Sequence, residues 1–266
     1  MNVMESILLA LTSTAIPFLC TIVGAGAVFF FKNEIPQGAQ RVFLGFAAGV
    51  MIAASVWSLL IPAIDMGKEQ GGTGLIPAAG GFIIGVAFLW LLDVLMPHLH
   101  PNSNEPEGVK SSLRRTTLLV LAVTLHNIPE GMAVGLAASV AQFGETTVIT
   151  ASSAIALSIG IGLQNLPEGA AVSLPLRREG VSRGKAFMLG TLSGVVEPLG
   201  AIAAILLSGG IIALMPWMLA FAAGAMLYVV VEELIPEAHL GEHSNVGTMG
   251  VLAGFLVMMV LDVALG

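Results

Sequence analysis

The hexapeptide HNIPEG at residues 126–131 recurs almost unchanged as QNLPEG at residues 164–169. Each copy lies inside an apolar stretch of the length that a membrane-spanning helix needs. Ionisable groups at membrane depth cost roughly 2.5–3.5 kcal/mol each on insertion scales and are usually functional. One stretch supplies a His and a Glu, the next supplies a Gln and a Glu, and a proline lies in both. This set of nitrogen and oxygen ligands predicts a buried cation site.

The composition places the whole chain in a lipid environment. Of its 266 residues 56% are hydrophobic and only 10% are charged, whereas soluble domains carry about 25% charged residues. The net charge of -7 does not indicate an acidic surface, because several of the 17 acids fall inside apolar stretches. Cys20 is the only cysteine, which excludes an intrachain disulfide and a cysteine-based metal site. We therefore expect membrane lipid as the surroundings and no nucleic-acid partner.

Glycine, proline and charge divide the sequence into eight apolar segments long enough to span a bilayer. They cover roughly residues 5–31, 40–64, 75–99, 114–142, 147–175, 184–208, 211–236 and 246–265. The predicted fold class is an all-α membrane protein with eight transmembrane helices. One transporter domain covers residues 1–266, with a polar loop at about 101–113. The N-terminus lacks the basic region of a secretory signal, so we interpret the first segment as a span.

The basic residues predict the orientation in the membrane. Nine of the ten Lys and Arg residues lie between segments one and two, three and four, or five and six, and only Lys68 lies on the other side. Because cytoplasmic loops collect Lys and Arg, both termini are expected outside, in a multi-pass protein of the inner (plasma) membrane.

The repeated motif orders its ligands on one helix face. Successive residues of an ideal helix are about 100° apart, so Glu130 projects at about 40°, between His126 at 0° and Asn127 at about 100°. The same holds for Gln164, Asn165 and Glu168, so that either carboxylate could be shared by two cations. Pro129 and Pro167 predict kinks, because proline lacks an N–H and crowds the carbonyl four residues back. A lone Pro-Glu pair would also fit a simple kink with a snorkelling acid, but a duplicated motif favours a site.

Other polar side chains extend this set. Glu197, before Pro198, is the natural third carboxylate, and one of the pair Glu232 and Glu233 is expected to face the pathway. Asp65 could attract cations on the outer side, although an ordinary helix-end acid fits equally well. Four histidines lie at the predicted cytoplasmic side, either as solvated loop residues or as weak metal ligands at the exit: His98, His100, His239 and His243.

These motifs, with Glu197 and the paired glutamates, resemble the ZIP family of divalent metal transporters, in particular its compact bacterial, GufA-like branch. The resemblance covers the whole chain. It implies Zn²⁺ uptake into the cytoplasm, with Cd²⁺, Fe²⁺ and Mn²⁺ as competing ions, by an elevator motion of segments one, four, five and six against the others. It also implies that the protein is a homodimer.

The resemblance further implies two adjacent metal positions. The first maps onto His126, Glu130, Gln164 and Glu168, with Met51 as a soft ligand. The second maps onto Asn127, Asn165 and Glu197, with Glu130 and Glu168 shared. Relatives often carry Asp where this chain has Asn165, which weakens the expectation of a second bound ion.

Three other functions fit parts of the sequence. A cation channel or a proton-coupled metal antiporter would use the same buried ligands. An intramembrane metalloprotease could use them to activate water, but the H-E-x-x-H motif is absent. We therefore expect a carrier and no enzyme activity.

Overall fold

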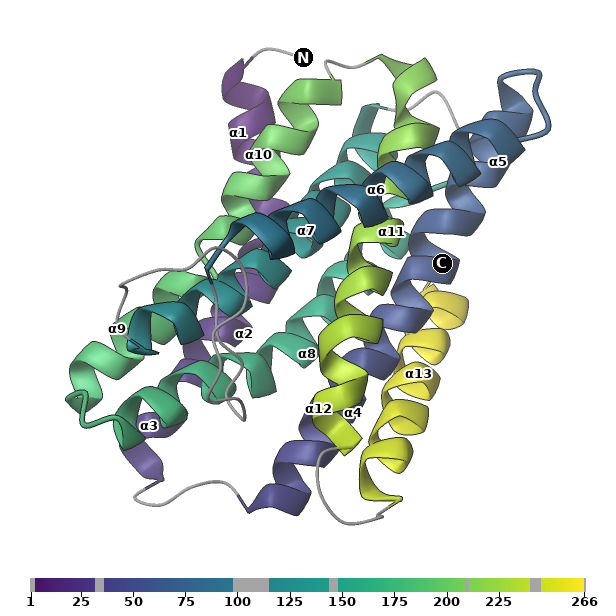
Figure 1. Ribbon diagram of the computed structural model, residues 1–266. Coiled ribbons are helices and arrows are strands. Elements are labelled where there is room, and N and C mark those ends of the chain that lie inside the picture. Colours follow the sequence, from purple (N-terminus) through teal and green to yellow (C-terminus); the bar gives the residue numbers. More distant parts are fainter. Residues whose placement is uncertain are drawn as a thin grey trace.

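The computed structural model describes residues 3–31, 36–97, 115–143, 148–208, 211–239 and 245–265. Within these residues every regular element is a helix (Figure 1). The elements are α1 (Val3–Ser13), α2 (Ala15–Ala25), α3 (Ala27–Phe30), α4 (Gln37–Ala53), η1 (Ala54–Leu60), α5 (Ile61–Glu69), α6 (Leu75–Leu95), α7 (Arg115–Phe143), α8 (Ala151–Arg178), α9 (Arg183–Ser193), α10 (Val196–Ser208), η2 (Ile212–Leu214), α11 (Met215–Val229), η3 (Val230–Leu234), α12 (Ile235–His239) and α13 (Val246–Leu265).

The described helices confirm the all-helical class and its apolar character. Five are long and apolar enough to cross a membrane, and a sixth candidate is the N-terminal pair α1 and α2–α3, which bends by 46°. Helix is present in each of the eight predicted segments. That α7 and α8 cross the membrane, and therefore that the chain has eight spans, stays a prediction.

Two helices end or begin a few residues inside the rough segment limits predicted above, for local reasons. The third helix ends at Leu95 because Met96 precedes Pro97 and takes an extended backbone conformation (φ −92°, ψ 126°). The fifth begins at Ala151 because Thr150 and Ser153 form a capping box, in which each side chain accepts a hydrogen bond from the other residue's N–H. A proline at one end and a capping box at the other therefore set limits that the apolar pattern gave only roughly.

Proline has different effects in different helices. Pro129 and Pro167 lie inside α7 and α8, which remain α-helical through both, so the predicted kinks stay predictions. Pro62 and Pro236 instead follow the π-helical stretches η1 and η3. A π turn is one residue wider than an α turn, which accommodates the ring and the missing N–H of a proline. The irregular backbone therefore lies in helices that do not carry the repeated motif.

A second internal repeat lies around these π-helical stretches. The sequence FAAGVM at residues 46–51 corresponds to FAAGAM at residues 221–226, and LIP at residues 60–62 recurs at residues 234–236. The first copy runs through α4, η1 and α5, and the second through α11, η3 and α12. In space α4 packs along α13, while α11 packs along α6. Figure 1 shows the first of these pairs, α4 and α13, side by side.

The helices pack in two groups. The first helix group holds α1, α2, α3, α7, α8, α9 and α10. The second helix group holds α4, α5, α6, α11, α12 and α13, with η1 and η3. The groups meet where α7 packs on α11 and where α8 packs on α4 and α13. The helices that carry the repeated motif, α7 and α8, therefore lie at the boundary.

Glycine brings helix backbones together inside each group. At several glycines an added Cβ would meet backbone atoms of the neighbouring helix. In the first group Gly24 approaches Leu166 in this way and Gly131 approaches Glu197. In the second group Gly49 approaches Val251 and Gly85 approaches Phe221. Among the described glycines only Gly160 closely approaches the other group, and it meets the side chains of Met258 and Val50. Each group is thus internally close-packed in the way small residues permit in lipid, and the contact between groups is looser.

Candidate metal site

The predicted ligands of the first motif lie together on α7. Asn127 and Glu130 are almost fully buried, at 1% and 0% exposure, and the His126 side chain is 12% exposed. The Nδ2 atom of Asn127 donates a hydrogen bond to the backbone oxygen of Ser193 at 3.2 Å, which ties α7 to the end of α9. The three residues therefore face protein, as the helical spacing predicts.

The second motif meets the first across the α7–α8 contact. The Nε2 atom of Gln164 donates to Oε1 of Glu130 at 2.5 Å. Glu168, one turn further along α8, is buried and interacts electrostatically with both Glu130 and His126. The first predicted metal position is thus assembled from facing side chains of two helices.

The second predicted position contains a residue that the sequence did not reveal. Oε1 of the fully buried Glu197 accepts hydrogen bonds from Asn165 Nδ2 at 3.0 Å and from Thr21 Oγ1 at 3.1 Å. Thr21 lies on α2, directly after the lone Cys20, in a segment without the repeated motif. A threonine inside an apolar helix is common, so only the packing of α2 against α8 and α10 identifies it.

The paired glutamates of η3 separate into two environments. Glu233 is 6% exposed, and its Oε1 lies 2.5 Å from His126 Nε2. Glu232, the adjacent residue, is exposed. Glu233 is therefore the member of the pair that reaches the site, and its contact with His126 joins the two helix groups.

The cluster leaves many oxygen atoms without a hydrogen bond. Within the described part of the chain, six residues of the two predicted metal positions each have one buried side-chain oxygen with no hydrogen-bond partner: Asn127, Glu130, Gln164, Asn165, Glu168 and Glu197. A buried polar atom without a partner costs about 1–3 kcal/mol, and a charged one costs more. A bound cation would satisfy such oxygens and offset the charge of the carboxylates.

The site is not assembled as a finished metal centre. Among the described residues no group of three or more His, Cys, Asp or Glu side chains is arranged to hold a metal ion. Several ligands are bonded to each other instead, as in the pairs Gln164–Glu130 and His126–Glu233. A cation would therefore have to exchange these internal contacts for its own coordination bonds.

Comparisons with known proteins show which family the chain resembles. The family model described as ZIP Zinc transporter matches residues 104–262. Zinc transporter ZIP11 of Homo sapiens is 38% identical over 98% of this chain and 98% of that protein. The chain belongs to the ZIP family. Zinc transporter GufA of Myxococcus xanthus is 38% identical over 92% of this chain and 95% of that protein. Zinc transporter ZIPB of Bordetella bronchiseptica is 37% identical over 97% of this chain and 81% of that protein.

Membership of the ZIP family confirms the resemblance carried by the two motifs, including its GufA-like branch. With the apolar helices, it makes the chain a multi-pass membrane protein of a transporter family. The role of each predicted ligand stays a prediction. Met51, the candidate soft ligand, is fully buried in the main apolar core, with Leu157 and Ile161 of α8 in the same cluster.

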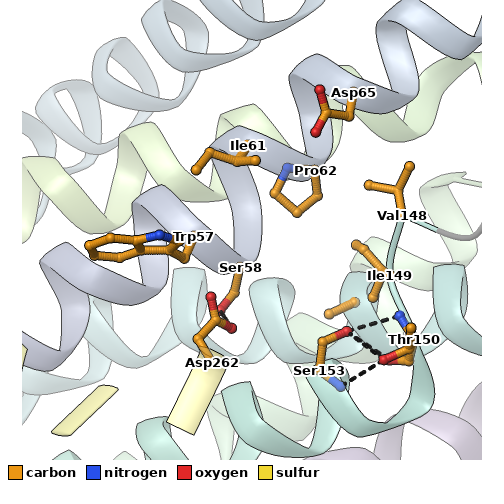
Figure 2. Close-up of a pocket in the computed structure, with 11 residues that line it drawn as sticks. Trp57, Ser58, Ile61, Pro62, Asp65, Val148, Ile149, Thr150, Ser153 and Asp262 are labelled. Atoms are coloured by element: carbon orange, nitrogen blue, oxygen red, sulfur yellow. Dashed lines mark hydrogen bonds between the residues drawn. The ribbon is translucent and has the colours of Figure 1, made fainter. Parts of the chain in front are cut away.

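A cavity of about 220 Å³ lies between α5, α8 and the end of α13 (Figure 2). Asp262 lines it and accepts a hydrogen bond from Ser58 at 2.9 Å. Asp65 also lines it, but pairs with Lys68 at 2.7 Å at the half-exposed surface. In this ZIP chain the predicted outer acid therefore has a basic partner, while Asp262, an acid within the last apolar segment, is bonded to a serine hydroxyl.

The predicted exit histidines are mostly outside the described residues, namely His98, His100 and His243. His239, at the end of α12, uses both ring nitrogens. Nδ1 lies 2.9 Å from the backbone oxygen of Ile235, and Nε2 lies 3.1 Å from Thr248 Oγ1. These contacts attach α12 to α13, and a ligand role for His239 stays a prediction.

Proposed function

We propose that this chain carries Zn²⁺ across the membrane into the cytoplasm through the cluster on α7, α8 and α10. Relatives at 37–38% identity are named zinc transporters. The ligand types suit Zn²⁺, and also Cd²⁺, Fe²⁺ and Mn²⁺, because His and carboxylate bind all of these ions. Competition among them is expected to depend on geometry and availability.

The observation that carries the proposal is the set of six buried oxygens without a partner. Four residues form the first position, His126, Glu130, Gln164 and Glu168. The second position shares the two carboxylates and adds Asn127, Asn165 and Glu197. The internal bonds among these groups suit a carrier, because an ion that exchanges bonds with protein partners can also be released.

An elevator motion would move the first helix group against the second. The close backbone approaches at glycine lie within each group, and the described approach between groups is made by side chains at Gly160. Side-chain contacts can be exchanged during sliding more readily than close backbone contacts, because helices in close backbone contact must repack before they can shift. This division matches the segments that the family resemblance predicts to move.

Orientation follows from the positive-inside rule. Cysteine introduced at Val181 is expected to react only with reagents that reach the cytoplasmic face, as at position 102, whereas cysteine at Gly72 or position 2 should be labelled from outside. Labelling of Val181 from outside in intact cells would overturn the inward direction of transport that we propose.

The decisive experiment measures metal uptake by the purified protein in liposomes, with the four metals in competition. We expect saturable Zn²⁺ uptake that His126→Ala abolishes. Gly184→Ala, which adds a methyl group in open space outside the cluster, should preserve this uptake. Metal loaded on the inside should accelerate entry of labelled metal through exchange. A flux that does not saturate and shows no exchange would instead indicate a channel.

A further inference from the structure

The contact between His126 and Glu233 connects the cluster to the boundary between the helix groups. His126 belongs to α7 of the first group, and Glu233 belongs to η3 of the second. Nε2 and Oε1 are 2.5 Å apart, and the two side chains are 12% and 6% exposed. This is a buried hydrogen bond between the groups, and one of its ends is a predicted metal ligand.

The chemistry of the imidazole makes this bond and metal coordination mutually exclusive at Nε2. A ring nitrogen either carries a proton, which it can donate, or has one lone pair, which it can offer to a proton or a metal. If Nε2 carries the proton, Nε2 donates the hydrogen bond and the carboxylate of Glu233 accepts it. If Glu233 carries the proton, its carboxyl group donates and the lone pair of Nε2 accepts. In both cases a metal at Nε2 must displace Glu233.

The helical period through α11 and η3 places Glu233 at this contact. Met226, Val229, Val230 and Glu233 are buried, whereas Glu232 is exposed. Spacings of three, four and seven residues belong to one face of a helix, so Glu233 continues the buried face of α11 into η3. This face delivers a carboxylate to a histidine of the other group.

We propose that Glu233 is not a metal ligand in this conformation but an exchange partner that holds His126 while the site is empty and yields it to the cation. Binding of the cation then removes a hydrogen bond between the two helix groups, so that occupancy of the site and freedom of the groups to move change together. This inference rests on the proposed function, because it requires His126 to bind the transported ion.

An exchange role and a ligand role for Glu233 predict opposite changes in metal affinity when the Glu233 side chain is removed. Removal of a ligand weakens binding, and removal of any negative charge near a cation also weakens it. Removal of a competitor strengthens binding, because the cation no longer breaks a bond to reach Nε2. Tighter binding after loss of an acid therefore opposes the general electrostatic trend and is diagnostic.

The test is an equilibrium titration of the purified full chain with Cd²⁺ or Zn²⁺. We expect Glu233→Ala to bind about tenfold more tightly than the parent, the effect of removing one charge-assisted hydrogen bond. Glu233→Gln keeps the size of the side chain and should shift affinity in the same direction by less. Glu232→Ala removes the same charge one residue away and should leave affinity equal or weaker.

A second series tests whether Glu233 acts through His126. In a His126→Ala background, Glu233→Ala should no longer tighten binding. Weaker binding by Glu233→Ala, or tightening that persists without His126, would overturn the exchange role while leaving the proposed site intact. If His126→Ala alone binds metal with parental affinity, the proposed site itself is wrong, and this inference is wrong with it.

Discussion

The two copies of the N-x-P-E-G motif occupy matching helices but have different partners. In α7 the first residue, His126, bonds to Glu233 of the other helix group. In α8 the matching Gln164 bonds to Glu130 inside its own group. The second residues also differ, because Asn127 donates to a backbone oxygen whereas Asn165 donates to the carboxylate of Glu197.

This difference teaches that a repeated sequence need not give repeated roles. The motif fixes which side chains share a helix face, since that depends only on the helical period. The partner depends on which helix packs against that face. α7 packs on α10 and α11, whereas α8 packs on α2, α4 and α13.

The largest expected effect is the loss of transport when a ligand is removed from either copy. His126→Ala and Glu168→Ala should each reduce uptake to below about one hundredth of the parental rate, since even partners of metal ligands contribute 10–100-fold. Uptake into liposomes, with protein amount and folding checked by size-exclusion chromatography, measures this. Parental rates for both variants would show that the motif does not bind the transported ion.

The glycines that end the two copies should be equally sensitive. A Cβ at Gly131 would collide with the backbone of Glu197, and one at Gly169 with the backbone of Thr21 and Ala25. Gly131→Ala and Gly169→Ala should each destabilise the protein by about 1–3 kcal/mol through overpacking. Thermal unfolding in detergent measures the loss. Gly184→Ala, whose Cβ would meet nothing within 4 Å, is the control and should be neutral.

Asn165→Asp tests the second position. The substitution removes the donor at 3.0 Å from Glu197 and places a carboxylate in its place. We expect lower thermal stability without metal, a larger rise on adding Zn²⁺ or Cd²⁺, tighter binding with two ions per chain, and slower maximal uptake because release is slower.

Thr21→Val is the companion variant, because it removes the other donor to Glu197 without adding charge. It should lower stability without changing the number of ions bound. Equal stoichiometry and affinity in the parent and in Asn165→Asp would show that residue 165 does not face the metal.

The smallest expected effect concerns protons. Coordination needs a ring nitrogen free of its proton and ionised carboxylates, so binding and uptake should weaken as pH falls towards about 5, with equal pH on both sides. His126→Gln makes the first copy resemble the second and removes one of the competing protons. Its Cd²⁺ affinity should change less between pH 5 and 7.5. The same slope in both proteins would exclude His126 as a ligand.

The helical class, the apolar segments and the side chains that share one face of α7 and of α8 were predictable from the sequence. They follow from composition and from the periodicity of a single helix, neither of which requires knowledge of the neighbouring helices. The family was predictable as well, because the two motifs identify it. The ends of helices were less certain, since they depend on caps and on prolines such as Pro97, whose effect is local but easily missed.

Only the tertiary structure decided the partners. Thr21 and Glu197 are 176 residues apart in sequence and come together because α2 packs against the start of α10. Glu233 rather than Glu232 reaches His126 because Glu233 lies on the same buried helix face as Met226 and Val230, and α11 packs on α7. Which carboxylate meets which histidine thus depends on packing between distant segments, which no short stretch of sequence encodes.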